Sequence, residues 1–167
     1  MKKIVFFLFL GVLFTCCEPE DKYPIIPKIV FLSLDKIPNE MGVDNKASLT
    51  FYFEDGDGDI GLNDTAEDLK PPFDTTSIYH YNFFIDYYEK QNGEFVKIDL
   101  PAEQNARIPR LSNNTPESID GTVSVEIFIN NITSVYDTVK FEFYIVDRAL
   151  HHSNVVSTPE IIIDKAK

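Results

Sequence analysis

The sequence predicts an all-β chain that folds as an antiparallel, immunoglobulin-like β-sandwich of about seven strands. Three stretches, at residues 47–54, 121–130 and 137–147, alternate apolar and polar side chains with a period of two. This alternation is typical of strands that bury one face. No window has the period of an amphipathic helix, so helix is expected only in short turns. A closed β-barrel is the alternative arrangement of the same strands.

Four further strands are expected at residues 28–34, 78–89, 95–100 and 160–164. Asn92 and Gly93 separate two of them, and both residues tolerate positive φ, which predicts a tight hairpin turn. The 167 residues suit a single domain. We therefore expect a signal peptide at 1–16, a tether with acidic residues and prolines at 17–27, and the sandwich at 28–167.

The N-terminus has the features of an export signal. Two lysines precede an apolar run at residues 4–14, which is too short to span a bilayer and fits the core of a signal peptide. The run ends in Leu-Phe-Thr-Cys-Cys, which resembles the lipobox of bacterial lipoproteins. That resemblance implies that Cys17 is acylated and becomes the mature N-terminus, with Cys16 as the alternative register.

The acidic residues 18–21 follow the cysteines directly. They resemble the export signal of Bacteroidota surface lipoproteins, and an ordinary polar tether is the alternative interpretation. Residues 144–154 are similar to the penultimate strand of immunoglobulin-like or fibronectin-like modules. As a whole, the chain resembles uncharacterised Bacteroidota cell-surface lipoproteins. This resemblance implies a lipid anchor in the outer membrane, a surface-exposed domain and no assigned activity.

The charge and the cysteines exclude several classes. Lys plus Arg number 15 against 27 Asp plus Glu, which gives a net charge of −12. Such a field repels polyanions, so no nucleic-acid partner is expected. The chain has 2 cysteines, both near the N-terminus, which excludes a disulfide scaffold and a cysteine-rich zinc module.

The most specific local motif is an Asp-Gly loop after the strand at 47–54. Asp55, Asp57 and Asp59 alternate with glycines, so their carboxylates can converge on one hard cation. The motif departs from the EF-hand pattern and resembles the calcium loops of thrombospondin type-3 repeats. Calcium is the expected ion, in a structural role, with Asp64, Asp147 and Asn63 as further ligands. The alternative is a polar turn without metal.

Aromatic residues also fall at outward positions of several expected strands: Tyr52, Phe84, Tyr88, Phe128 and Tyr144. An exposed patch of such residues would mark a partner or glycan surface. The alternative is that they form cross-strand pairs that only stabilise the sheets.

These features predict a lipid-anchored cell-envelope module that binds a partner or has a structural role, and that is not an enzyme. The chain has neither a Gly-x-Ser-x-Gly elbow nor a His-Glu-x-x-His motif. The alternative function is a carbohydrate-binding accessory lipoprotein that uses the Tyr/Phe face, followed by a small envelope hydrolase. An envelope protein or a glycan is the expected kind of partner.

Overall fold

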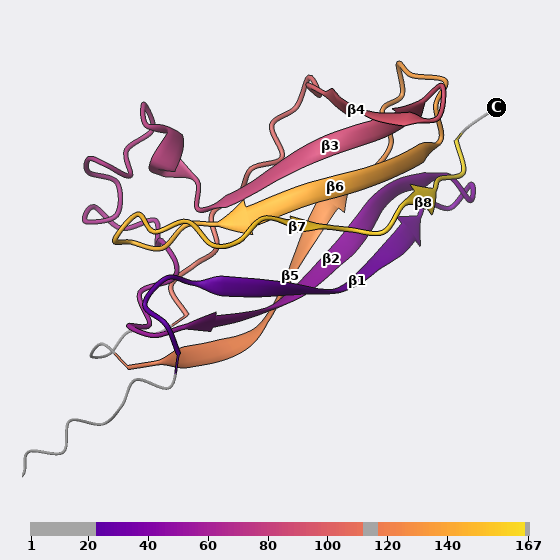
Figure 1. The fold of residues 1–167 in the computed structure, drawn as a ribbon. Coiled ribbons are helices and arrows are strands. Elements are labelled where there is room, and N and C mark those ends of the chain that lie inside the picture. Colours follow the sequence, from indigo (N-terminus) through magenta and orange to yellow (C-terminus); the bar gives the residue numbers. More distant parts are fainter. Residues whose placement is uncertain (1–22, 112–116, 166–167) are drawn as a thin grey trace, which may run out of the picture.

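The computed structural model describes residues 23–111 and 117–165 (Figure 1). The predicted signal peptide, Cys16 and Cys17 lie outside these residues. Among the described residues, no helix has the length and hydropathy needed to cross a bilayer. The one helical element in this part of the chain is the 3₁₀ turn Ile78–His80.

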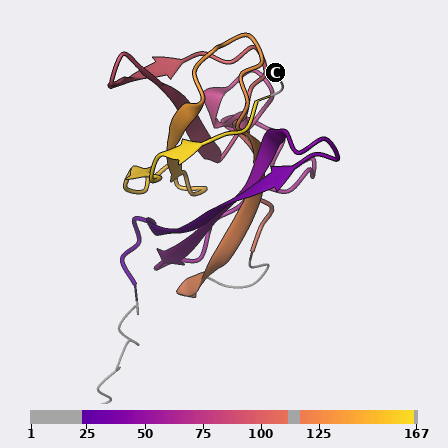
Figure 2. The ribbon, with the colours of Figure 1, turned by 90° about the vertical axis from the view of Figure 1, so that its right-hand side faces the viewer.

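The strands form two antiparallel sheets, which Figure 2 shows as separate layers. One sheet has the order β1-β2-β5, built from β1 (Lys28–Pro38), β2 (Asp44–Asp55) and β5 (Ile119–Phe128). The other has the order β4-β3-β6, built from β3 (Phe83–Gln91), β4 (Glu94–Ile98) and β6 (Thr138–Ile145). Two short strands, β7 (Val156–Ser157) and β8 (Ile161–Ile162), both pair with β6. The sandwich is confirmed, and it has eight strands rather than about seven.

The strand order is immunoglobulin-like with one difference. The first, second and fifth strands share a sheet, and the third and sixth share the other, as in that fold. The fourth strand, β4, pairs with β3 instead of lying beside β5. The turn between them holds Asn92 at φ 52° and Gly93 at φ 93°, so the tight hairpin predicted from these two residues is present.

The core lies between the sheets and comes from the alternating residues. The inward side chains Leu49, Phe51 and Phe53 of β2 are buried. Phe51 contacts the opposite sheet, with its ring centroid 5.8 Å from that of Phe83 and 5.4 Å from that of Phe143. The inward positions expected from the period-two pattern are therefore the ones that fill the core.

For two of the expected strands, the predicted boundaries are wrong. The strand expected at 78–89 begins only at Phe83, because the Ser77 hydroxyl accepts from the Tyr79 N–H and caps a helical turn there. The strand expected at 160–164 is reduced to Ile161–Ile162. Pro159 precedes it and has no N–H to donate to a ladder, so the final strand is split into β7 and β8.

Candidate metal site and its surroundings

Four aspartates from two distant segments meet at one end of the sandwich. Asp55 ends β2, Asp57 and Asp59 lie in the loop that follows, and Asp147 comes two residues after β6. One carboxylate oxygen from each lies within 4.8 Å of all the others. The structure thus brings together four of the six predicted metal ligands, and this acidic group can hold a metal ion.

Backbone N–H groups hold three of the four side chains in place, those of Asp55, Asp59 and Asp147. The Asp59 N–H donates to Asp55 Oδ2 at 2.9 Å, which closes the loop through Gly58 at φ +66°. The Arg148 N–H donates to Asp59 Oδ1 at 3.3 Å. The His151 N–H donates to Asp147 Oδ1 at 2.7 Å, and His151 Nδ1 lies 2.9 Å from Asp147 Oδ2. The cluster is therefore built before any ion enters it.

Two of the carboxylate oxygens lack a partner. Asp55 has 0% exposure, and both its Oδ1 and that of Asp57 are buried without a hydrogen-bond donor among the described residues. Burial, together with the charges of Asp57 and Asp59, raises the pKa of Asp55 to about 7. Burial and the charge of Asp147 raise the pKa of Asp59 to about 6. The site therefore requires protons or a cation.

This electrostatic arrangement predicts how the metal-free protein responds to pH. An aspartate with a raised pKa binds its proton more tightly in the folded state than in the unfolded state. The free energy of unfolding should therefore fall as the pH rises from about 4 to about 7, through the pKa values of Asp59 and Asp55, by roughly 1–4 kcal/mol. His151 acts in the same direction, because its bond to Asp147 raises its pKa.

Urea denaturation in EDTA at pH 5, 6, 7 and 8 measures this effect. Excess calcium should reverse the trend, because a metal binds only the deprotonated carboxylates. A metal-free protein that is equally stable at pH 5 and pH 8 would contradict the prediction.

Asp64 and Asn63 do not join the cluster, so their assignment as metal ligands is not supported. The Asp64 side chain is 88% exposed and lies 3.4 Å from Arg107 Nε. The Asn63 side chain turns the other way and accepts from the Arg110 N–H at 3.2 Å. The loop folds back after Ile60 and Leu62, whose side chains are buried, and this carries the following polar residues away from Asp55.

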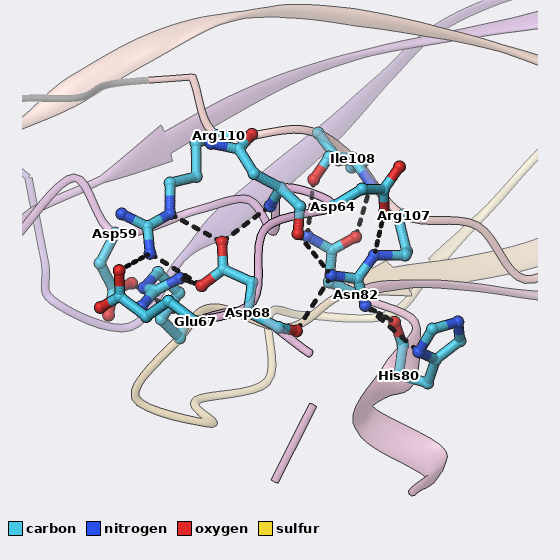
Figure 3. A network of polar contacts seen from close by, with 11 residues as sticks. Asp59, Asp64, Glu67, Asp68, His80, Asn82, Arg107, Ile108 and Arg110 are labelled. Carbon is cyan, nitrogen blue, oxygen red and sulfur yellow. Dashed lines mark hydrogen bonds and ion pairs between the residues drawn. The ribbon is translucent and has the colours of Figure 1, made fainter. Parts of the chain in front are cut away.

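A second polar network beside the acidic cluster was not predicted (Figure 3). Its centre is Asp68, which is fully buried. Arg110 donates to both carboxylate oxygens, from Nε at 3.0 Å and from Nη2 at 2.7 Å, and Arg148 Nη1 donates to Oδ1. The Asn63 N–H adds a bond of 2.8 Å to Oδ2. Burial favours the neutral form of Asp68, but these donors outweigh it and hold its pKa well below the usual range.

The composition carried a signal for this network. The chain has only three arginines, Arg107, Arg110 and Arg148. All three contact Asp68, since Arg107 Nη2 donates to its carbonyl oxygen at 3.2 Å. Arg148 also follows Asp147 of the acidic cluster directly, so the network and the cluster share a backbone segment.

The five outward aromatic residues do not form one patch. Tyr52 and Phe128 lie on the β1-β2-β5 sheet, whereas Phe84, Tyr88 and Tyr144 lie on the sheet that contains β3 and β6. In a sandwich the outward faces of the two sheets point in opposite directions, so one surface cannot hold all five. On the second sheet, Phe84 and Tyr144 stack with ring centroids 4.9 Å apart, while Tyr88 lies under Lys140.

Comparisons of the chain with protein-family models, with curated proteins and with solved structures give no match.

Proposed function

We propose that the protein is a non-catalytic cell-envelope module whose Asp-Gly loop binds a structural calcium ion. The observation that carries the proposal is the fully buried, unpartnered Oδ1 of Asp55, which lies among three further carboxylates. Four negative charges this close repel one another strongly unless a cation neutralises them. A divalent ion removes that repulsion and supplies the missing partner.

The ligand set favours calcium over smaller or softer ions. All four candidate ligands are carboxylate oxygens, which hard cations prefer. Oxygens that surround calcium at 2.3–2.6 Å lie up to about 5 Å apart, so a set whose oxygens all lie within 4.8 Å of one another fits calcium. Magnesium keeps several of its waters and is usually held by one or two carboxylates, which a set of four does not match. The imidazole of His151 directs Nδ1 to Asp147, so this nitrogen is not available as a ligand for zinc.

A structural role is supported by the segments that pack on the loop. The Gly56 N–H donates to Pro24 O at 2.8 Å. A Cβ on Gly58 would lie 2.2 Å from Glu117 O, and one on Gly61 would lie 2.4 Å from Pro109 O. The ion would therefore fix the loop against the start of the domain, the entry to β5 and the arginine segment, residues 107–110.

The first test is thermal melting of the purified protein in EDTA and in calcium up to ~10 mM. Calcium at about 100-fold above its dissociation constant adds about 2.7 kcal/mol, or roughly 5–10 °C for a domain of this size. The variant Asp57→Asn/Asp59→Asn should lose this rise. In EDTA it should melt no lower than the unmodified protein, because it relieves repulsion.

Asp64→Asn is the matched control, since it removes a carboxylate of the same loop that lies outside the cluster. It should keep the full response to calcium. Equal melting midpoints in EDTA and calcium for the unmodified protein would refute the calcium site.

The envelope location is proposed on the N-terminal sequence alone. We infer that acylation of Cys17 anchors the chain in the outer membrane, with the sandwich presented at the cell surface to an envelope protein or a glycan. More than one acyl chain gives stable attachment. The acidic residues 18–21 support surface export.

Cys17→Ala should move the protein from the membrane fraction of expressing cells to the soluble fraction, whereas Cys16→Ala should leave it in the membrane fraction. Fractionation with immunodetection of both variants makes the measurement. The reverse pattern would assign the anchor to Cys16. Membrane attachment of the double variant would contradict a lipid anchor.

A further inference from the structure

A pocket of about 540 Å³ lies on the outer side of the sheet that contains β3 and β6. Its base includes Phe84 of β3 and Tyr144 of β6, which face each other across the ladder. One wall is the segment around the helical turn Ile78–His80, drawn beside the start of β3 in Figure 1. The other wall comes from Glu103 and Asn105. Volumes of 300–1,000 Å³ are typical of small-molecule sites.

The base is a rigid row of parallel rings. Phe84 and Tyr144 stack at 4.9 Å with an interplanar angle of 10°, and His152 covers the other face of Tyr144 at 5.4 Å and 16°. Tyr79 packs edge-on against His152, with centroids 5.9 Å apart. Phe84 itself is half-buried and lines the pocket, so part of its ring is accessible to a ligand. The row holds Phe84 upright and pre-organised.

The walls offer hydrogen-bond donors and acceptors together. Ser77 Oγ accepts from the Tyr79 N–H at 3.0 Å, which leaves its proton to donate. His80 Nδ1 lies 3.3 Å from Phe73 O, which leaves Nε2. Glu103 Oε1 accepts from Asn105 Nδ2 at 2.5 Å, which leaves Oε2 as an acceptor. The hydroxyl of Thr75 has no partner in the described part of the chain and both donates and accepts.

We propose that this pocket binds a neutral saccharide. A pyranose ring has an apolar C–H face that packs on an aromatic ring, and its edge carries hydroxyls that donate and accept. Those two properties match the accessible ring of Phe84 at the base of the pocket and the mixed walls. Glu103 and the net charge of −12 disfavour an anion. An organic cation offers no acceptor, so it would leave the hydrogen-bond donors of the walls unpaired.

Isothermal titration of the purified protein tests the proposal. The probes are glucose, galactose, mannose and N-acetylglucosamine with their α- and β-linked oligomers, and inorganic phosphate and tetramethylammonium as charged alternatives. We expect at least one neutral saccharide to bind. Phe84→Ala should weaken it about tenfold or more, because it removes the stacking face.

Phe95→Ala is the matched control, because Phe95 lies on the same sheet face beneath Lys90 and Lys140 and does not line the pocket. It should keep the affinity. Thr75→Val removes only an unpartnered hydroxyl, so it leaves the fold intact and should weaken binding several-fold. Three results would overturn the proposal: no neutral saccharide binds, only phosphate or tetramethylammonium binds, or Phe84→Ala and Thr75→Val bind as tightly as the unmodified protein.

Discussion

Asp68→Ala is expected to lower the free energy of unfolding by about 3–5 kcal/mol, because it leaves two partly buried guanidinium groups without their counter-charge. Arg110 and Arg148 would then face each other across the space that the carboxylate fills. The Asn63 N–H would lose its acceptor as well. Urea denaturation of the purified protein at pH 7, where the carboxylate of Asp68 is ionised, measures the change.

Asp64→Ala is the control for this prediction. Asp64 lies four residues earlier in the same loop, but it is 88% exposed and its one ion pair spans 3.4 Å. An exposed ion pair contributes about 0–1 kcal/mol, so this variant should unfold close to the unmodified protein. Equal losses for Asp64→Ala and Asp68→Ala would show that the network around Asp68 does not stabilise the fold.

Gly61→Ala is expected to cost about 3 kcal/mol or more, from two separate sources. Gly61 has φ +110°, a conformation in which an L side chain costs about 1–2 kcal/mol. A Cβ there would also lie 2.4 Å from Pro109 O and 2.5 Å from Arg110 Cα, so the backbone must move. That movement would displace Arg110 from Asp68, because the two segments are in direct contact.

Gly93→Ala separates the two sources. Gly93 has φ +93°, but a Cβ there would have no atom within 4 Å. It should therefore show only the conformational cost. Equilibrium denaturation of both variants gives the difference, which reports the close approach of Gly61 to the arginine segment. Equal destabilisation of the two variants would contradict that close contact.

The sequence was most informative where the pattern is local. Side-chain alternation identifies which residues of β2, β5 and β6 face inward, because a strand has a strict period of two. Asp55, Asp57 and Asp59 identify the acidic loop because they lie close together in the sequence, spaced by glycines. Asp147 joins them because β2 and β6 end at the same end of the sandwich. The sandwich expected from the sequence allows Asp147 to lie there.

The remaining features depend on contacts between distant segments. Alternation indicates that Tyr52 and Tyr144 point outward, but it does not assign them to a sheet, and they lie on different sheets. Asp68 lies in a long loop without periodicity, and its partners Arg110 and Arg148 are 42 and 80 residues away. The pocket at Phe84 likewise joins segments separated in sequence, so no local pattern predicts it.

The bond between the Gly56 N–H and Pro24 O has a mechanical consequence. Tension on residues ahead of Tyr23 would meet this bond, and the contacts that Tyr23 itself makes, before it reaches Lys28, where β1 pairs with Glu54 at the end of its ladder. The Gly56 bond lies ahead of that pair, between two of the clustered aspartates. If the N-terminus is anchored as proposed, the acidic loop would carry part of the traction on the domain, and an ion bound there would stiffen that point of attachment.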